Sequence, residues 1–155
     1  MATLTITHTE SLTLGDGDGT DRGSTNVQTL TVSEVDHRIV TVGTTPVDFL
    51  KFGVMPGAGI YKDGTVKYLR ITNLDATNFI HITVRQSDAE YCVKLEAEGS
   101  DEGTNSFTLG PTVMDAHEDG DTGTSVAPTF ANIDSITLGA DTAACKVEIF
   151  VAATS

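Results

Sequence analysis

Hydrophobic and polar residues alternate along much of this chain, which is the pattern of β-strands buried on one face. The alternation is clearest over residues 3–9, where threonine occupies every second position. Similar runs, separated by Gly, Asn and Asp, predict strands at about residues 27–32, 35–42, 47–53, 66–73, 78–85, 90–97, 104–109, 132–138 and 145–151. No long window has a helical period. The chain is therefore predicted to be all-β, with about eight to ten short strands.

This number of strands in one domain predicts an antiparallel β-sandwich with a jelly-roll-like topology. An immunoglobulin-like topology is less favoured, because the chain has no Trp and no pair of cysteines that would face each other. The 155 residues are enough to bury one sizeable core. We expect residues 1–25 to form an N-terminal strand with an acidic Gly/Asp loop, as an arm, and residues 26–155 to form a single sandwich domain.

The segment from Val66 to Arg85 has the pattern of a β-hairpin. A four-residue loop over residues 74–77 would place Ile71 opposite Ile80 and gather the aliphatic side chains on one face. The other face would then carry aromatic, cationic and hydroxyl side chains: Tyr68, Arg70, Phe79, His81, Thr83 and Arg85. Protein interfaces are enriched in Tyr, Phe and Arg, so this set is a candidate interface. Alternatively, the face is an ordinary second layer or is covered by the N-terminal strand.

The two cysteines are predicted to lie on opposite faces of their strands. Cys92 alternates with apolar residues and falls on the polar face, whereas Cys145 shares its face with Val147 and Ile149. This phase disfavours a disulfide. We expect two free thiols, as in a reducing compartment.

Two Gly-rich acidic segments, residues 15–25 and 117–124, do not have a strand pattern. In the first, Asp16, Asp18 and Thr20 provide oxygen ligands at alternate positions, as a calcium loop requires. The segment departs from an EF-hand loop, because Asp21 stands where Gly is needed and Val27 where a bidentate Glu is needed. The favoured interpretation is a solvated surface loop, with calcium binding as the alternative. Apart from that alternative, no cofactor is expected.

The chain is strongly acidic, with 9 Lys and Arg against 22 Asp and Glu, a net charge of −13. This charge repels phosphate groups, and the few cations form no basic patch, so neither nucleic acid nor an anionic membrane is expected as a partner. The N-terminus lacks the basic and apolar regions of a signal peptide. We therefore expect a protein that is made and used without Sec export.

No catalytic motif is visible in the sequence. The four histidines, His8, His37, His81 and His117, lack zinc-binding spacing, and there is no GxSxG, P-loop or GxGxxG motif. Glu96 and Glu98 fall on the polar face of their strand, so nothing marks them as a buried acid pair. Aromatic residues are too few for a glycan-binding platform. We expect a protein that is not an enzyme.

Three stretches have the pattern of a known group of proteins: KYLRITNLDATNFI (67–80), VKLEAEG (93–99) leading to SFTL (106–109), and ADTAACKVE (140–148). They resemble small virion structural proteins of tailed bacteriophages, over roughly residues 66–151. The chain departs from that pattern by inserting residues 100–105. The resemblance implies a capsid cement or decoration protein with a β-sandwich fold, often trimeric, and without catalytic residues.

The sequence thus predicts a non-enzymatic virion protein that stabilises the capsid through contacts between its subunits. The implied partners are the major capsid protein and further copies of this chain, as a homotrimer, and the implied location is the virion, assembled in the host cytoplasm. The alternatives are a non-catalytic β-sandwich that binds calcium or a glycan, or a phage protein associated with the tail or fibre. An acidic surface with one less acidic face suits a small protein that attaches at high copy number.

Overall fold

Every regular element that the structure describes is a β-strand. The computed structural model describes residues 1–12, 22–55, 57, 59–62, 64–86, 89–110 and 133–154. Within these ranges the strands are β1 (Ala2–Leu12), β2 (Arg22–Val32), β3 (Glu34–Val42), β4 (Val47–Gly53), β5 (Ile60–Lys62), β6 (Val66–Asn73), β7 (Ile80–Gln86), β8 (Ala89–Leu95), β9 (Ser106–Leu109), β10 (Ser135–Ala140) and β11 (Cys145–Ala153). The described part accordingly offers no helix long and apolar enough to cross a membrane.

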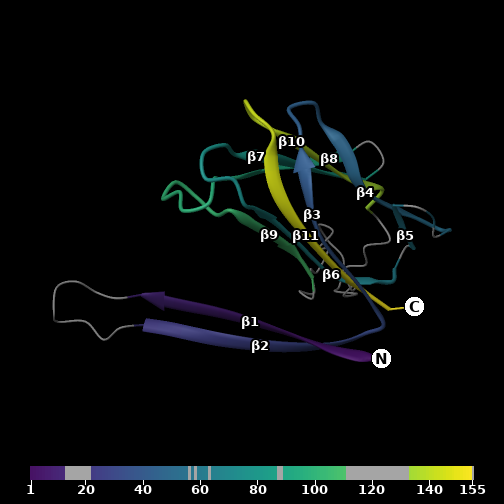
Figure 1. Cartoon of the computed structure of the whole chain (residues 1–155). Coiled ribbons are helices and arrows are strands. Elements are labelled where there is room, and N and C mark those ends of the chain that lie inside the picture. Colours follow the sequence, from purple (N-terminus) through teal and green to yellow (C-terminus); the bar gives the residue numbers. More distant parts are fainter. Residues whose placement is uncertain are drawn as a thin grey trace, which may run out of the picture.

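Two sheets pack face to face and form a β-sandwich, which confirms the predicted architecture (Figure 1). One sheet has the strand order β5-β4-β10-β7-β8 and the other the order β3-β11-β6-β9. All pairs are antiparallel except β4 with β5. Most consecutive strands, such as β3 and β4 or β10 and β11, lie in opposite sheets. The jelly-roll topology stays a prediction. The strand order of the two sheets is compatible with it.

The core between the sheets is built from the inward positions of each strand. In β11, Val147, Ile149 and Val151 are buried, while Lys146, Glu148 and Phe150 alternate with them and point outward. The largest fully buried side chains in this core are Leu50, Leu69, Ile71, Ile80, Ile82, Leu95, Ile136, Leu138, Ile149, Val42 and Val147. Burying each such side chain contributes about 1.5–3 kcal/mol. The sandwich is therefore held mainly by aliphatic packing.

The prediction of a hairpin over residues 66–85 is wrong. β6 lies in the four-stranded sheet and β7 in the five-stranded sheet, so Ile71 pairs with Ile149 and Ile80 pairs with Ala140 and Leu95. The predicted aliphatic face is nevertheless correct. Ile71 and Ile80 are both fully buried in one core, which they enter from opposite sheets.

Hydrogen bonds of the connecting turn explain why the chain crosses between the sheets here. Asn73 is fully buried, and its Nδ2 donates to the carbonyl oxygens of Asn78, at 2.8 Å, and Glu96, at 2.9 Å. The Oδ1 atom of Asp75 accepts from the backbone N–H groups of Thr77 and Asn78. These side-chain bonds replace the backbone bonds of a tight hairpin, since Asn and Asp readily stabilise turns in this way.

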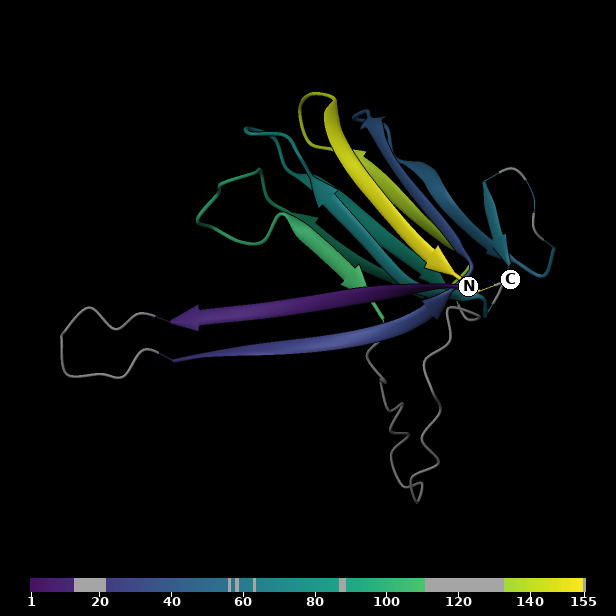
Figure 2. The ribbon, with the colours of Figure 1, turned by 60° about the horizontal axis from the view of Figure 1, so that its bottom comes forward.

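Strands β1 and β2 form a long hairpin that projects away from the sandwich (Figure 2). Their pairing runs from Ala2 opposite Val32 to Leu12 opposite Arg22. We call this hairpin the arm. The sequence predicts an arm over residues 1–25. In the structure the second strand of the arm extends further, to Val32. Its base packs on the outer face of the four-stranded sheet through a small apolar cluster: Ile6, Val32, Leu4 and Leu30 against Tyr68, Phe150 and Ala152.

Candidate interface

The six residues of the predicted interface are divided between two faces of the molecule. Tyr68 and Arg70 lie on β6, in the four-stranded sheet. Phe79, His81, Thr83 and Arg85 lie on β7 or directly before it, in the five-stranded sheet. The structure therefore does not bring the six residues together, because the two strands belong to different layers.

On the five-stranded sheet, the predicted residues contact neighbours on their own sheet. The rings of Phe79 and His81 meet edge to face at 5.0 Å, and Lys94 Nζ lies 4.3 Å from the centre of the Phe79 ring. The Nε atom of Arg85 is 3.0 Å from Glu90 Oε1, while Thr83 Oγ1 is 3.5 Å from Cys92 Sγ. The charge of Arg85 is thus balanced by Glu90, and that of Lys94 by Glu96, whose Oε1 lies 2.6 Å from Lys94 Nζ.

On the four-stranded sheet, Tyr68 is covered by the arm. Its side chain is only 6% exposed and packs with Ile6, Val32 and Phe150. Burial raises the pKa of the Tyr68 hydroxyl, which the nearby positive charge of Arg70 partly offsets. At Tyr68 the arm covers the face, as the alternative of a covering N-terminal strand predicts, whereas Arg70 keeps 38% of its side chain exposed.

A charged cluster lies next to this covered patch, around the carboxylate of Glu148. His37 Nε2 is 2.7 Å from Glu148 Oε1, and Arg70 Nη2 is 2.6 Å from Glu148 Oε2. The hydrogen bond from His37 is the main cause that lowers the pKa of Glu148, with the charge of Arg70 acting in the same direction. The guanidinium of Arg70 also lies 5.8 Å above the ring of Phe150.

The sheet register explains why these residues meet. Phe150 on β11 is paired with His37 on β3 and with Arg70 on β6, so the two basic side chains flank the central strand. Glu148 lies two residues earlier on the same outward face and is reached from both sides. The outward phase of each strand can be read from its alternation. The pairing of β11 with β3 and β6 cannot be read from the alternation, because these strands are far apart in the sequence. For this reason the sequence does not identify Glu148 and His37 as neighbours.

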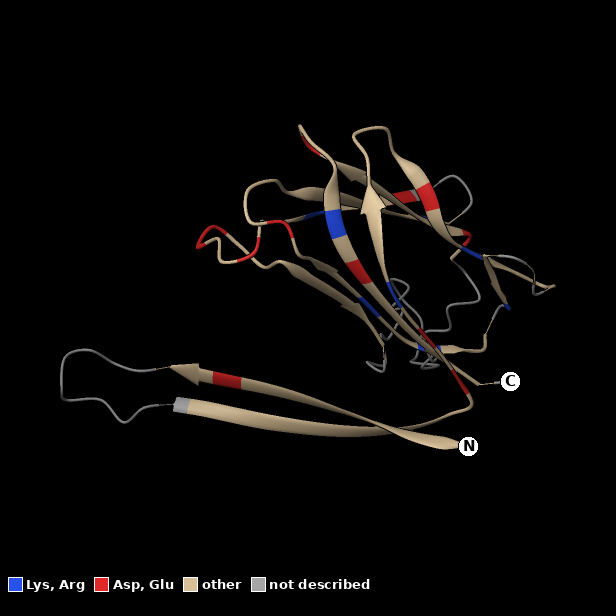
Figure 3. Ribbon diagram, in the orientation of Figure 1, with Lys and Arg blue, Asp and Glu red and all other residues tan. Residues whose placement is uncertain are grey.

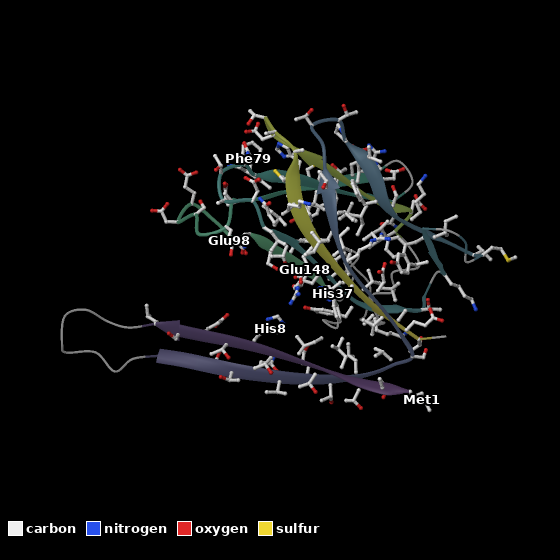
Figure 4. All side chains as sticks on the ribbon, in the orientation of Figure 1. Met1, His8, His37, Phe79, Glu98 and Glu148 are labelled. Atoms are coloured by element: carbon white, nitrogen blue, oxygen red, sulfur yellow. The ribbon has the colours of Figure 1, made fainter. Side chains whose placement is uncertain are left out.

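A groove runs between the arm and the outer face of the four-stranded sheet. Its larger hollow, of about 630 Å³, is lined by Leu4, Thr5, Ile6, Thr7 and His8 of β1 together with His37, Tyr68, Arg70, Thr104, Ser106, Thr108 and Phe150. A second hollow of about 290 Å³ continues along the arm and shares His8 and Thr108 with the first. We call the two hollows together the arm groove. Figure 4 shows His8 on the side of β1 that faces the sandwich.

The arm groove exposes the edges of two strands. Side chains of a strand alternate between its faces, so lining by five consecutive residues of β1 means that the groove follows the edge of this strand. β1 is paired only with β2, and β9 ends the four-stranded sheet next to β6. Both strands therefore present backbone groups without a strand partner in the described residues.

The remaining sequence-based expectations concern metals and thiols. Asp16, Asp18 and Thr20, the proposed calcium ligands, lie outside the described residues. Among the described residues, no group of three or more His, Cys, Asp or Glu is arranged to hold a metal ion. Cys92 is free and exposed and Cys145 is free and buried, which confirms the predicted absence of a disulfide and the predicted phase of both strands.

Charge is unevenly distributed over the described part of the chain (Figure 3). The two arm strands contain only Glu10 and Arg22 as charged side chains. The loop between β8 and β9, by contrast, carries the exposed acidic residues Glu98, Asp101 and Glu102. The arm is thus the least charged large element of a protein whose net charge is −13.

The fold and site define the class of this protein only as a β-sandwich with a projecting hairpin arm. Comparisons with protein-family models, with curated proteins and with solved structures find no match.

Proposed function

We propose that this chain is a non-enzymatic structural protein of a tailed-phage virion, of the capsid cement or decoration type. In this role it stabilises the particle by binding the major capsid protein and further copies of itself, as a trimer. The observation that carries the proposal is the arm, which is anchored to the sandwich at its base and extends beyond it (Figures 1 and 2). The resemblance of residues 66–151 to virion proteins supports the same role.

The arm is built like an element that needs a second chain. An isolated two-stranded hairpin is marginally stable in water, and independent stability requires a third strand or a packed layer. Strands of eleven residues span about 37 Å. The apolar cluster with the sandwich involves only the base, at Leu4, Ile6, Leu30 and Val32. Contact with another protein would supply the layer that the rest of the arm lacks.

The outer face of the arm suits such a contact. Most of its side chains are exposed threonines: Thr3, Thr5, Thr7, Thr9, Thr25, Thr29 and Thr31. Their methyl groups provide apolar area, while their hydroxyl groups keep the face hydrated until a partner binds. Because the arm has few charges, it can approach another acidic surface with less repulsion than the rest of the molecule.

The proposal is tested with particles of the virus that encodes the chain. Deleting the gene should give virions that lack the protein and are less stable to heat, and added full-length protein should bind to them and restore stability. A matched variant replaces residues 8–26 by Asn-Gly, which closes the hairpin at the Thr7–Val27 pair and keeps the anchoring residues. This variant should fold and fail to bind.

Mass spectrometry of purified virions decides whether the protein is a virion component at all. Its absence from the particles would overturn the proposal. Cryo-electron microscopy separates a capsid protein from a tail- or fibre-associated one by the position of the added density, and light scattering of the free protein measures whether it is a trimer.

A further inference from the structure

The outer edge of β2 is open to solvent on the side of the arm that faces away from the sandwich. The arm groove is lined by consecutive residues of β1, whereas β2 contributes the alternate residues Ser24, Asn26 and Gln28. β2 therefore borders the groove with one face only, and its free edge lies on the far side of the arm (Figures 1 and 2). Within the described residues, β1 is the one strand that pairs with β2. Another strand can thus reach this edge without displacing a described element.

This edge lacks the features that keep edge strands from pairing with other chains. Proteins protect such edges with charged side chains or Pro, or keep them short. Among the other described edge strands, β5 and β9 have three and four residues, and β3 and β8 carry charged side chains of both signs. The edge of β1 faces the groove. β2 has neither charge nor Pro over residues 23–32, so its edge is the one best suited to accept a further strand.

The middle of β2 has nearly the same chemistry when it is read in either direction. Val27 is the central residue of the strand, with an amide on each side, at Asn26 and Gln28, and then a threonine on each side, at Thr25 and Thr29. When two copies of a strand pair antiparallel about a two-fold axis, residues at equal distances before and after the axial residue meet. With the axis at Val27, each valine, amide and threonine meets its own kind. This self-complementarity is what an isologous contact requires.

Each pair in this register is favourable. Val27 is 57% exposed, and two valines directly opposite each other, with Cβ atoms about 4.5–5.5 Å apart, would shield one another from water. An Asn and a Gln amide can each donate and accept, so they can bond reciprocally. Threonine pairs across strands occur within the arm itself, where the hydroxyls of Thr9 and Thr25 are 3.5 Å apart. None of these pairs includes a charge, so two chains of net charge −13 can meet here without opposing like charges.

We propose that β2 pairs with β2 of a second copy of this chain, antiparallel and about a two-fold axis through Val27. The joined sheet has the order β1-β2-β2-β1, and each arm gains the further strands that an isolated hairpin needs for stability. A two-fold contact does not hold the three subunits of a trimer together. The inference therefore rests on the proposed function only for its place on the particle, where the contact links neighbouring trimers.

Disulfide cross-linking tests the register of the pairing. The background is Cys92→Ser, which removes the exposed native thiol and leaves Cys145, which is buried. Opposed residues of antiparallel strands have Cα atoms about 4.5–5.5 Å apart, within reach of a disulfide, so Val27→Cys should give a covalent dimer on mild oxidation. Thr31→Cys, at an exposed position of the same strand, is the matched control. Its two copies would be about 27 Å apart and should not cross-link.

A mixture of two variants makes the register test more specific. Thr25→Cys and Thr29→Cys should each cross-link poorly alone, because either residue would be about 14 Å from its own copy. When the two proteins are mixed before oxidation, they should form a heterodimer, because Thr25 of one chain meets Thr29 of the other. Cross-linking of Val27→Cys no stronger than that of Thr31→Cys, or no gain on mixing, would overturn the inference.

Sedimentation velocity measures the pairing without a disulfide. One edge contact is small beside the roughly 1,200–2,000 Å² of a standard interface, so a Kd of about 10–100 µM is expected. Val27→Lys puts two like charges opposite each other and should weaken association at least tenfold. Thr7→Lys is the control, because it adds the same charge at the β1 residue paired with Val27, one strand further from the contact. It should associate at least as well as the wild type. Equal association of the two variants would contradict the pairing.

Analysis of virions distinguishes this inference from the proposed function. If Val27→Cys cross-links as described but the protein is absent from virions, the pairing of the arms stands and the virion role falls. If the protein is a virion component and Val27→Cys does not cross-link either free or on the particle, the pairing falls and the virion role stands.

Discussion

The carboxylate of Glu148 is held 2.6 Å from Nη2 of Arg70, which approaches from the neighbouring strand of the same sheet. His37, from the strand on the other side, occupies the second oxygen at 2.7 Å. One side chain thus links three strands, β3, β11 and β6, on the face that the arm partly covers. It also fixes the position of the basic residues that line the arm groove.

Replacing Glu148 by Gln should destabilise the protein by about 0.5–1 kcal/mol, because it removes the charge partner of Arg70. The effect is modest since Arg70 is 38% exposed and solvent screens the pair. Urea unfolding near neutral pH measures it. Glu90→Gln is the control, because its pair with Arg85 is more exposed and should contribute almost nothing.

Stability should fall in acid through groups whose pKa is lowered by folding. The pKa of Glu148 lies below its ordinary value of 4.5, mainly because of the His37 hydrogen bond, and that of Asp48 lies below 3.8, mainly because of the Thr137 hydroxyl. Each contributes stability that is complete above the ordinary value and lost as pH falls through the lowered one. Urea midpoints measured from neutral pH into this acid range should therefore decline, and the decline should be shallower in Glu148→Gln.

Replacing Asn73 by Ala should cost about 2–4 kcal/mol, because the carbonyl oxygens of Asn78 and Glu96, in partly buried residues, would lose the fully buried donor that they share. Thermal unfolding followed by circular dichroism measures the loss. Asn26→Ala, at an exposed position of the arm, is the matched substitution and should change stability by less than about 0.5 kcal/mol. A similar loss in both variants would contradict the role assigned to Asn73.

Replacing Ile6 by Ala should release the arm without unfolding the sandwich. Ile6 is 8% exposed and packs on Tyr68, so its truncation removes about 1–3 kcal/mol from the contact. Hydrogen exchange should become faster in β1 and β2 and stay unchanged in β11. Leu12→Ala, at the exposed end of β1, should leave exchange at the base of the arm unaltered.

The two thiols should react at very different rates with a disulfide reagent such as Ellman's. Cys92 is exposed and should react within the dead time of mixing, whereas Cys145 is buried and burial raises the pKa of its thiol. One equivalent should therefore react in the folded protein and a second only after denaturant is added. Slow reaction at both positions, or none after unfolding, would contradict this assignment.

The inward and outward phase of the strands could be predicted from the sequence, whereas the pairing could not. Ile71 and Ile80 were correctly placed on the core side, because alternation depends only on each strand itself. Their assignment to one hairpin was wrong, because a hairpin and a crossing between two sheets give the same alternation. The contact from Asn73, the last residue of β6, to Glu96, directly after β8, joins positions far apart in the sequence and leaves no local signal.

The candidate site was predicted in part for the same reason. Tyr68 and Arg70 were identified from an unusual outward face, and the covering N-terminal strand was among the alternatives. His37 and Glu148 belong to strands that pair with β6 or with each other only in the folded sheet. The short strand β5, with three residues, carries too little pattern to be found.

The strand order also determines when the protein can fold during its synthesis. β11 lies in the middle of the four-stranded sheet, between β3 and β6, although along the chain it follows all the other described strands. Until β11 has left the ribosome, β3 lacks the strand with which it pairs in the described sheet, and the core lacks Val147, Ile149 and Val151. The two strands of the arm pair only with each other, but an isolated hairpin is marginally stable in water. The layer beneath the arm includes Phe150 and Ala152 of β11, so the arm should become stable only when β11 has been made and the sandwich has closed.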